Sequence, residues 1–308
     1  MRRCLFACQL LLCILIAAVI FGSVGCEPIS PVRGKAKILV HPGPFSFLMM
    51  EARFIFLMDY LTKETSWEMD MVCAPPEMES LTSLVETERF ALSLVNPYYY
   101  LILKMQYGAV PLVKAVSLDG RTEYRGLIII HPKSPIGSIN DLRGKSVLAS
   151  SRSNVCGFLA QWMHLKECGL EPERDVKFIF GDTQEEIFEK IALGQAEVGF
   201  VREDVLQALT KAKGAVPNVT VLAITQYYPN PCFVSFPDAD SDLVRNVKTA
   251  LLQLDLGNAS HRFILERLRI SGFAPASADD YREFEDLLVS YGLFSAPFDA
   301  SHESGVPR

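Results

Sequence analysis

The chain has 308 residues, of which 49% are hydrophobic and 10% aromatic, and its formal net charge is −6. This composition is ample for one large or two medium domains with buried cores. Charges of both signs are mixed along the sequence without a basic stripe, which argues against a nucleic-acid partner.

Residues 1–26 have the pattern of a targeting segment rather than of a folded domain. Arg2 and Arg3 form a positive start, residues 4–21 are almost uninterruptedly apolar, and small residues lead into Cys26. This segment resembles a bacterial lipoprotein signal, which implies cleavage before Cys26 and lipid attachment to its sulfur. The alternative is an uncleaved N-terminal membrane anchor. Either way, the rest of the chain is expected to be tethered outside the cytoplasmic membrane.

Four cysteines follow this segment, at Cys73, Cys156, Cys168 and Cys232. In an oxidising envelope they could form up to two disulfides. Cys156 and Cys168 should not pair with each other, because a helix between them would separate them by about 18 Å. No Cys or His spacing matches a metal site, so we expect neither a metal nor a cofactor.

After a spacer over 27–35, apolar runs alternate with amphipathic segments. Strands are predicted over 36–41, 68–73, 90–95 and 109–117, with helical patterns over 47–61, 75–88 and 101–108. Such an alternation predicts a parallel sheet with helices on both faces.

The most informative stretch is 124–170. It predicts strands over 127–130 and 146–150, a helical turn over 140–145, and a helix from Gly157 to Gly169.

A polar loop over 151–154 separates the second of these strands from the helix. Free backbone N–H groups and the positive end of the helix dipole would meet at Ser153 and Asn154, so an anion could bind there without a charged side chain. The alternative is that Ser153 or Asn154 only caps the helix.

The alternation resumes in the second half of the chain. Strands are predicted over 176–180, 196–201 and 219–225, and helices over 184–193, 202–211, 240–253, 259–267 and 278–290. The two sets of units are separated near 121–126 and rejoined near 225–231. This organisation predicts two lobes joined by two crossovers, with lobe 1 over 36–124 and 226–294 and lobe 2 over 125–225. The polar tail over 295–308 is expected to be disordered.

Several short motifs lie at the predicted strand ends. They are Asn96-Pro97-x-x-Tyr100, Tyr124-x-x-Leu127-Ile128-Ile129, Ser138-Ile139-Asn140-Asp141-Leu142-Arg143-Gly144-Lys145, Gly194-x-x-Glu197-Val198-Gly199 and Tyr228-Pro229-Asn230-Pro231. With these motifs, the chain over about 36–291 resembles the periplasmic binding proteins of phosphate, phosphite and phosphonate ABC transporters.

The resemblance implies an α/β type II periplasmic-binding-protein fold, in which two Rossmann-like lobes close on a ligand in the cleft between them. It implies a lipid-anchored solute-binding protein on the periplasmic side of the bacterial envelope, and not an enzyme. The ligand would be a small anion, such as an oxyanion or a phosphonate, and the partner would be an ABC permease in the inner membrane.

By position in this family, the ligand loop is Asn154-Val155-Cys156-Gly157, where relatives typically have Ser-Thr-Ser-Gly. Asn154 and the backbone N–H groups can still donate, but the three hydroxyls are missing. Thr183 takes the place where the family tends to have a histidine, and Asp182 stands beside it.

Further candidates follow strand ends or hinges, and they are Asn96, Tyr100, Tyr124 and Tyr227. Each tyrosine offers a hydroxyl and a flat apolar face, although core packing is the alternative for any one of them. His41, Arg125 and Arg152 lie near the predicted pocket, with a structural role for His41 and exposure to solvent for the arginines as the default.

Two other functions fit the same clamp. A sensing protein would dock on a membrane receptor or kinase instead of a permease. The altered ligand loop fits a protein that binds a different ligand as its signal. An enzyme is disfavoured, because no Ser-His-Asp set, carboxylate pair or metal cluster stands out.

Overall fold

The computed structural model describes residues 33–41, 47–74, 78–213 and 218–294. The predicted signal segment over 1–26 and the predicted tail over 295–308 lie outside these ranges. From Gly34 onward the chain forms one compact unit that contains two β-sheets. Within the described ranges, no helix combines the length and the apolar character needed to cross a membrane.

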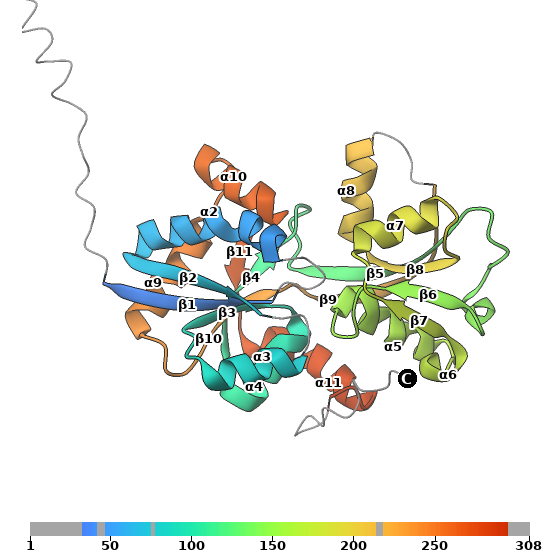
Figure 1. The fold of residues 1–308 in the computed structure, drawn as a ribbon, viewed down its shortest axis with the longest axis horizontal. Helices are drawn as coiled ribbons and strands as arrows, with labels where there is room; N and C mark the ends of the chain where they lie inside the picture. The colour runs from blue at the N-terminus through green and yellow to red at the C-terminus, as the bar shows by residue number, and fades with distance from the viewer. Residues whose placement is uncertain (1–32, 42–46, 75–77, 214–217, 295–308) are drawn as a thin grey trace, which may run out of the picture. The chain divides into compact units, whose positions relative to one another are not determined.

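The first sheet has the strand order β11-β4-β10-β3-β1-β2 (Figure 1). Its strands are β1 (Gly34–Val40), β2 (Trp67–Cys73), β3 (Leu92–Val95), β4 (Val110–Val116), β10 (Cys232–Ser235) and β11 (Gly272–Pro275). The associated helices are α2 (Phe47–Thr65), α3 (Met78–Thr87), α4 (Pro97–Tyr107), α9 (Ser241–Gln253), α10 (Ala259–Leu268), η3 (Ala278–Tyr281) and α11 (Arg282–Ser290).

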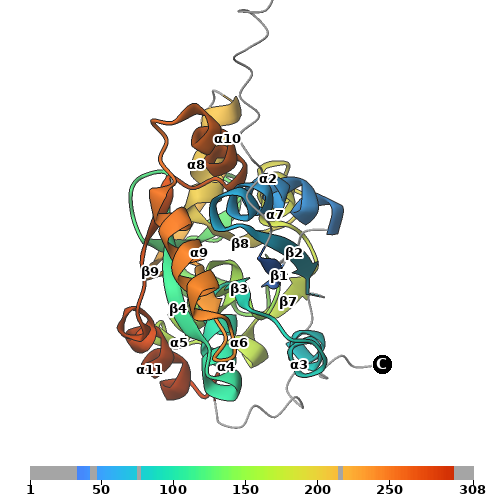
Figure 2. The ribbon, with the colours of Figure 1, turned by 90° about the vertical axis from the view of Figure 1, so that its left-hand side faces the viewer.

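Both faces of the first sheet are buried. Helix α2 lies on the face opposite to α3 and α4 (Figures 1 and 2). In β1, Ile38 belongs to the core cluster that contains Leu57 of α2, whereas its neighbour Leu39 belongs to the cluster that contains Leu103 of α4. Successive strand side chains point to opposite faces, so a run that is apolar throughout fits a sheet covered on both sides.

The second sheet has the order β7-β6-β8-β5-β9. Its strands are β5 (Glu123–Ile130), β6 (Ser146–Ala149), β7 (Lys177–Phe180), β8 (Val198–Arg202) and β9 (Thr220–Pro229). The associated helices are η1 (Ile139–Leu142), the π-helix η2 (Val155–Leu159), α5 (Ala160–Glu167), α6 (Pro172–Asp175), α7 (Gln184–Ala192) and α8 (Glu203–Lys213).

The predicted α/β class with two sheet-based lobes is confirmed, but the sheets are mixed rather than parallel. β1, β2 and β3 run parallel, as do β6, β7 and β8. β10 is antiparallel to β3 and β4, β11 to β4, and β5 to β8 and β9. A helix that crosses over between two strands of one sheet makes those strands parallel. The chain reaches β5 and β10 by crossing from one sheet to the other instead, so these strands can run antiparallel to their neighbours. β10 and β11 were not predicted from the sequence.

The two crossovers lie side by side. β5 pairs with β9 so that Tyr124 faces Tyr228, and the next turn is held by Asn230. The Nδ2 of Asn230 donates to the carbonyl of Ala115 at 2.9 Å and to that of Arg121 at 3.2 Å. β5 therefore begins at Glu123 and β9 ends at Pro229, beyond the predicted strands over 127–130 and 219–225.

The four cysteines after the signal segment are free thiols. No disulfide joins them in the part of the chain that the structure describes, and the exclusion of a Cys156–Cys168 pair stays a prediction. Cys156 and Cys232 are buried, whereas Cys168 is exposed.

Candidate functional site

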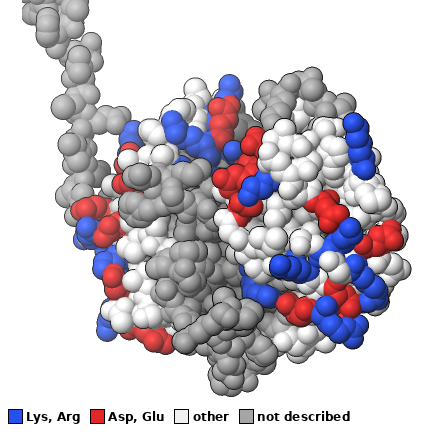
Figure 3. Space-filling model, turned by 45° about the vertical axis from the view of Figure 1, so that its right-hand side comes forward, with Lys and Arg blue, Asp and Glu red and all other residues white. Residues whose placement is uncertain are grey.

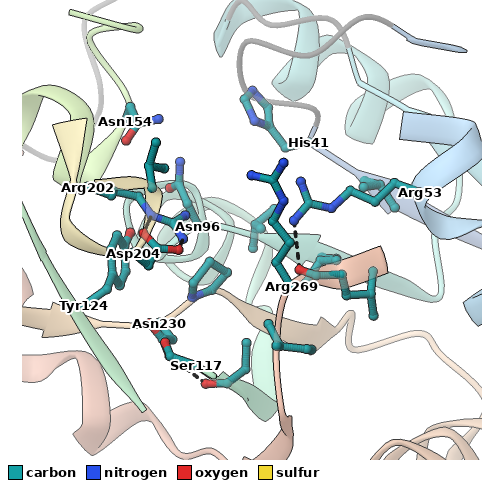
Figure 4. A pocket seen from close by; sticks show the side chains of 18 of the residues that line it. His41, Arg53, Asn96, Ser117, Tyr124, Asn154, Arg202, Asp204, Asn230 and Arg269 are labelled. Atoms are coloured by element: carbon teal, nitrogen blue, oxygen red, sulfur yellow. Dashed lines mark hydrogen bonds and ion pairs between the residues drawn. The ribbon is translucent and has the colours of Figure 1, made fainter. Parts of the chain in front are cut away.

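A cavity of about 230 Å³ lies where the strand ends of the two sheets meet (Figure 4). Elements of both sheets supply its polar lining, which comprises His41, Arg53, Asn96, Ser117, Tyr124, Asn154, Gln184, Glu185, Arg202, Asp204, Asn230 and Arg269. Three arginines face two carboxylates in this set, so the described lining carries a formal charge of +1 with a neutral histidine.

Arg53 comes from the middle of α2. Its Nη2 donates to the carbonyl of Leu268 at 2.8 Å, and its side chain lies beside that of Arg269 (Figure 4). Burial, followed by repulsion from Arg269 and Arg202, lowers the pKa of Arg53 to about 10. Arg53 therefore remains charged at neutral pH, and an anion between these guanidinium groups would relieve their repulsion.

Arg202 ends β8 on the opposite wall. Its Nε donates to Oδ1 of Asp204 at 2.8 Å, its Nη2 donates to Oδ2, and its guanidinium lies 5.0 Å from the ring centre of Tyr124. Burial works against the charge of Arg202, but attraction to Asp204 is stronger, so the pKa of Arg202 is raised. Burial likewise works to raise the pKa of Asp204, yet the ion pair lowers it. This pair is charged at neutral pH.

Arg269 follows α10 in a left-handed conformation, with φ of 57°. Its Nη1 donates to Oε1 of Glu185 at 2.6 Å. Glu185 lies in the first turn of α7, so this ion pair joins an element of the first sheet to one of the second.

Asn154 presents the N-terminus of η2 to the cavity. Its Oδ1 accepts a hydrogen bond from the backbone N–H of Gly157 at 2.8 Å, so the predicted cap is present. The side-chain amide extends toward the cavity (Figure 4). Capping and cavity lining are thus combined in one residue, and the two interpretations of this loop are compatible.

Asn96 and Ser153, both predicted site residues, contact each other. Asn96 Nδ2 donates to the carbonyl of Ser153 at 3.1 Å, and the hydroxyl of Tyr99 donates to Ser153 Oγ at 2.9 Å. Tyr99 also stacks against His41, with ring centres 3.9 Å apart. This second group of contacts between the sheets was not predicted.

The remaining residues of the predicted ligand loop are buried. Val155 and Cys156 are fully enclosed in the core, and Cys156 Sγ contacts the carbonyl of Tyr124 at 3.7 Å. Burial raises the pKa of the Cys156 thiol well above its usual range, so it stays protonated. Gly157 has no room for a side chain, since a Cβ there would lie 2.5 Å from Ser150 Oγ.

Seven of the ten predicted site residues are not among the described residues that line the cavity: Ser153, Val155, Cys156 and Gly157 of the loop, and Tyr100, Thr183 and Tyr227. Tyr100 is buried, with its ring centre 4.6 Å from that of Tyr281. Tyr227 lies under the guanidinium of Arg121, and Thr183 forms the capping box of α7. Gln184 and Glu185, which follow Thr183, line the cavity in its place.

The arginines suggested by the sequence are engaged elsewhere. Arg125 forms a bidentate ion pair with Glu203, and Arg152 pairs with Glu173. Asp182, which would repel an anion, pairs with Lys190 at 2.6 Å. Charges of both signs are interspersed over the face shown in Figure 3, so that face offers no single-sign surface.

Sequence analysis missed the charged residues Arg53, Arg202, Arg269, Glu185 and Asp204. A signal existed for Arg53, because it lies three residues after Met50 and four before Leu57, on the apolar side of α2. Arg202 stands at a strand-to-helix junction, as Asn154 does. No sequence signal marks Arg269.

Among the described residues, no group of three His, Cys, Asp or Glu side chains is placed to hold a metal ion.

Solved structures with the same fold include three bacterial proteins. The binding-protein component of an ABC phosphonate transporter from Pseudomonas aeruginosa matches with a TM-score of 0.72 and 12% identity, over 88% of this chain and 92% of that one. PhnD1 from Prochlorococcus marinus in complex with methylphosphonate matches with a TM-score of 0.72 and 16% identity, over 84% and 99%. A Xanthomonas citri protein bound to ATP matches with a TM-score of 0.66 and 16% identity, over 84% and 97%.

The family model for the periplasmic substrate-binding protein of phosphonate ABC transporters matches residues 48–281, well over half of the chain. The match spans strands of both sheets and every described charged residue of the cavity. The chain therefore belongs to the family of periplasmic substrate-binding proteins of phosphonate ABC transporters.

Proposed function

We propose that this protein is a lipid-anchored periplasmic receptor that captures a small oxyanion in the arginine-lined cavity and delivers it to an ABC permease. The observation that carries the proposal is the convergence of Arg53, Arg202 and Arg269 on one cavity. Guanidinium groups form paired hydrogen bonds with carboxylate, phosphonate and sulfonate oxygens, and these bonds strengthen when water is excluded.

The size of the cavity supports a small ligand. Its volume of about 230 Å³ lies below the range of about 300–1,000 Å³ that is usual for drug-sized ligands. Asn154 adds a neutral amide, and Tyr124 adds an aromatic face that can pack against a short apolar substituent. A phosphonate or a sulfonate with a short alkyl group combines these features.

The two lobes would work as a clamp, without making or breaking a covalent bond. We assign residues 36–124 and 226–294 to one lobe and 125–225 to the other. Ion pairing between Arg269 and Glu185, and hydrogen bonding between Asn96 and Ser153, join elements of the two sheets on the cavity border. A ligand that adds contacts to both sides would favour the closed state, and release would follow opening.

The proposed anchor is a lipid on Cys26, supported by the small residues before it and the apolar run that precedes them. Mass spectrometry of the protein from bacterial membranes tests this assignment. We expect a mature N-terminal peptide that begins at a diacylated Cys26, and Cys26→Ala should leave the signal segment uncleaved. A wild-type protein that retains residues 1–25 would contradict the lipid anchor.

A thermal-unfolding screen tests the proposed ligand class. Methylphosphonate, phosphite, phosphate, methanesulfonate and acetate are added separately to the purified full-length protein. A ligand at about 100 times its Kd adds about 2.7 kcal/mol of stability, which raises Tm by several degrees. No shift with any oxyanion would overturn the proposal, and choline serves as the cationic control.

A further inference from the structure

The carboxylates of the cavity limit the charge of its ligand. Asp204 accepts two hydrogen bonds from Arg202, and Glu185 accepts one from Arg269. Each acid therefore offsets one arginine, and the described lining retains one positive charge from three arginines and two acids. Both acids line the cavity, Glu185 from α7 and Asp204 from α8.

A bound anion would face all of these groups at once. Arg53 comes from α2, Arg269 follows α10, and the second sheet supplies Glu185, Arg202 and Asp204. The other titratable groups in the described lining are His41, which directly follows β1, and Tyr124 of β5.

Charge matching then separates singly from doubly charged ligands. One negative charge balances the described lining, whereas a second would remain uncompensated beside the two carboxylates. A neutral or cationic ligand would leave the guanidinium groups without their anion.

We propose, on the basis of the proposed function, that this cavity selects singly charged tetrahedral oxyanions over doubly charged ones. The selected ligands are sulfonates and monoprotonated phosphonates. Glu185 and Asp204 set this selectivity, because their carboxylates would repel the second negative charge of a dianion. A phosphonate is therefore bound with one proton retained.

Two ligands of matched shape provide the test. Methylphosphonate loses its second proton as pH rises, whereas methanesulfonate keeps a single charge throughout. Calorimetric titration of the full-length protein, from below to above the second pKa of methylphosphonate, should show its affinity falling about tenfold per pH unit above that pKa. The affinity for methanesulfonate should stay level, and any effect of His41 would change both ligands alike.

The variant Glu185→Gln tests whether this carboxylate causes the pH dependence of methylphosphonate binding. Glu185→Gln removes one of the two negative charges that repel a dianion. The fall in methylphosphonate affinity with pH should therefore become at least threefold smaller than in the wild type. Glu173→Gln is the control, because Glu173 pairs with Arg152 away from the cavity lining. This control should reproduce the wild-type pH profile.

The possible failures are distinguishable. Binding of both ligands, with methylphosphonate becoming tighter as it gains its second charge, would overturn the selectivity and leave the proposed function intact. An unchanged pH profile in Glu185→Gln would remove Glu185 from this role. Failure of every oxyanion to bind at any pH would overturn the proposed function together with the selectivity.

Discussion

At the scale of single residues, the cavity depends on polar groups that each have two tasks. Asn154 caps η2 through Oδ1 and directs its amide toward the cavity. Arg202 forms an ion pair with Asp204 and covers the ring of Tyr124. A substitution at such a residue therefore changes both stability and affinity, and a matched control is needed to separate the two effects.

Asn154→Leu should weaken binding of the oxyanion by about tenfold or more, because one hydrogen bond to a charged group contributes about 1.5–3 kcal/mol. Loss of the cap should also cost about 1 kcal/mol of stability. Asp240→Leu is the control, since Asp240 caps α9 by accepting from the N–H groups of Asp242 and Leu243. Calorimetry should show reduced affinity only for Asn154→Leu, and an equal reduction in both variants would remove Asn154 from the site.

The ion pair between Arg202 and Asp204 predicts a loss of stability in acid. The pKa of Asp204 lies below its ordinary value of 3.8 in the folded protein, because attraction to Arg202 outweighs burial. The stabilisation is therefore present above that value and lost as pH falls through the folded pKa. Thermal melts between about pH 5 and about pH 3 should show a shallower decline of Tm for Asp204→Asn than for the wild type. Parallel curves would contradict this assignment.

The individual site residues could be predicted only in part. Asn96 follows β3 of the first sheet, Asn154 follows β6 of the second, and Tyr124 lies at the start of β5 where the chain crosses between the sheets. The sequence indicates such positions because ligands of α/β sheets bind beyond the carboxyl ends of the strands. Tyr100 also follows a strand, but α4 begins at Pro97, and one helical turn carries its ring into the core against Tyr281. Arg269 reaches the cavity because its backbone adopts the left-handed conformation, which no sequence pattern predicts.

At the scale of elements, the π-helix η2 brings the ligand loop close to β6. Gly157 permits this approach, since a Cβ there would lie 2.5 Å from Ser150 Oγ and 2.8 Å from Asn154 Oδ1. Cys156 departs from helical geometry with φ of −102° and ψ of 16°. Such π-helical turns are frequent at functional sites.

Gly157→Ala should destabilise the protein by about 1–3 kcal/mol through overpacking and should displace the Asn154 cap. Ser150→Ala should by itself have little effect, because Ser150 Oγ is buried without a hydrogen-bond partner in the described structure. Combining the two should restore part of the stability lost in Gly157→Ala, as measured by urea unfolding. A double variant as unstable as the sum of the single changes would contradict this packing argument.

The crossover between β9 and β10 depends on Asn230. Its Nδ2 donates to the carbonyls of Ala115 and Arg121, and its own carbonyl accepts from the hydroxyl of Tyr281. Asn230→Ala leaves buried acceptors without a donor and should cost about 1–3 kcal/mol in urea unfolding. The exposed Asn140→Ala should change stability by less than about 0.5 kcal/mol, and an equally small effect at both positions would count against this role of Asn230.

At the scale of the whole molecule, the sequence predicts the two sheets better than their strand directions. Apolar runs and helical periodicity locate most elements, but neither property encodes the partner or the direction of a strand. β10 and β11 have four residues each, and β11 contains both a glycine and a proline, which are depleted in strands. Their pairing with β4 follows from the return of the chain to the first sheet, which is a property of the complete fold.

The central claim is that the guanidinium groups of the cavity hold a small oxyanion, and calorimetric titration of methylphosphonate into Arg53→Met tests it most directly. Methionine replaces the apolar stem of arginine but removes the guanidinium group and its charge, and Arg152→Met is the matched control outside the cavity lining. We predict saturable one-to-one binding to the wild type and to Arg152→Met, and an affinity at least about tenfold lower for Arg53→Met. Equal affinity in all three proteins would contradict the account.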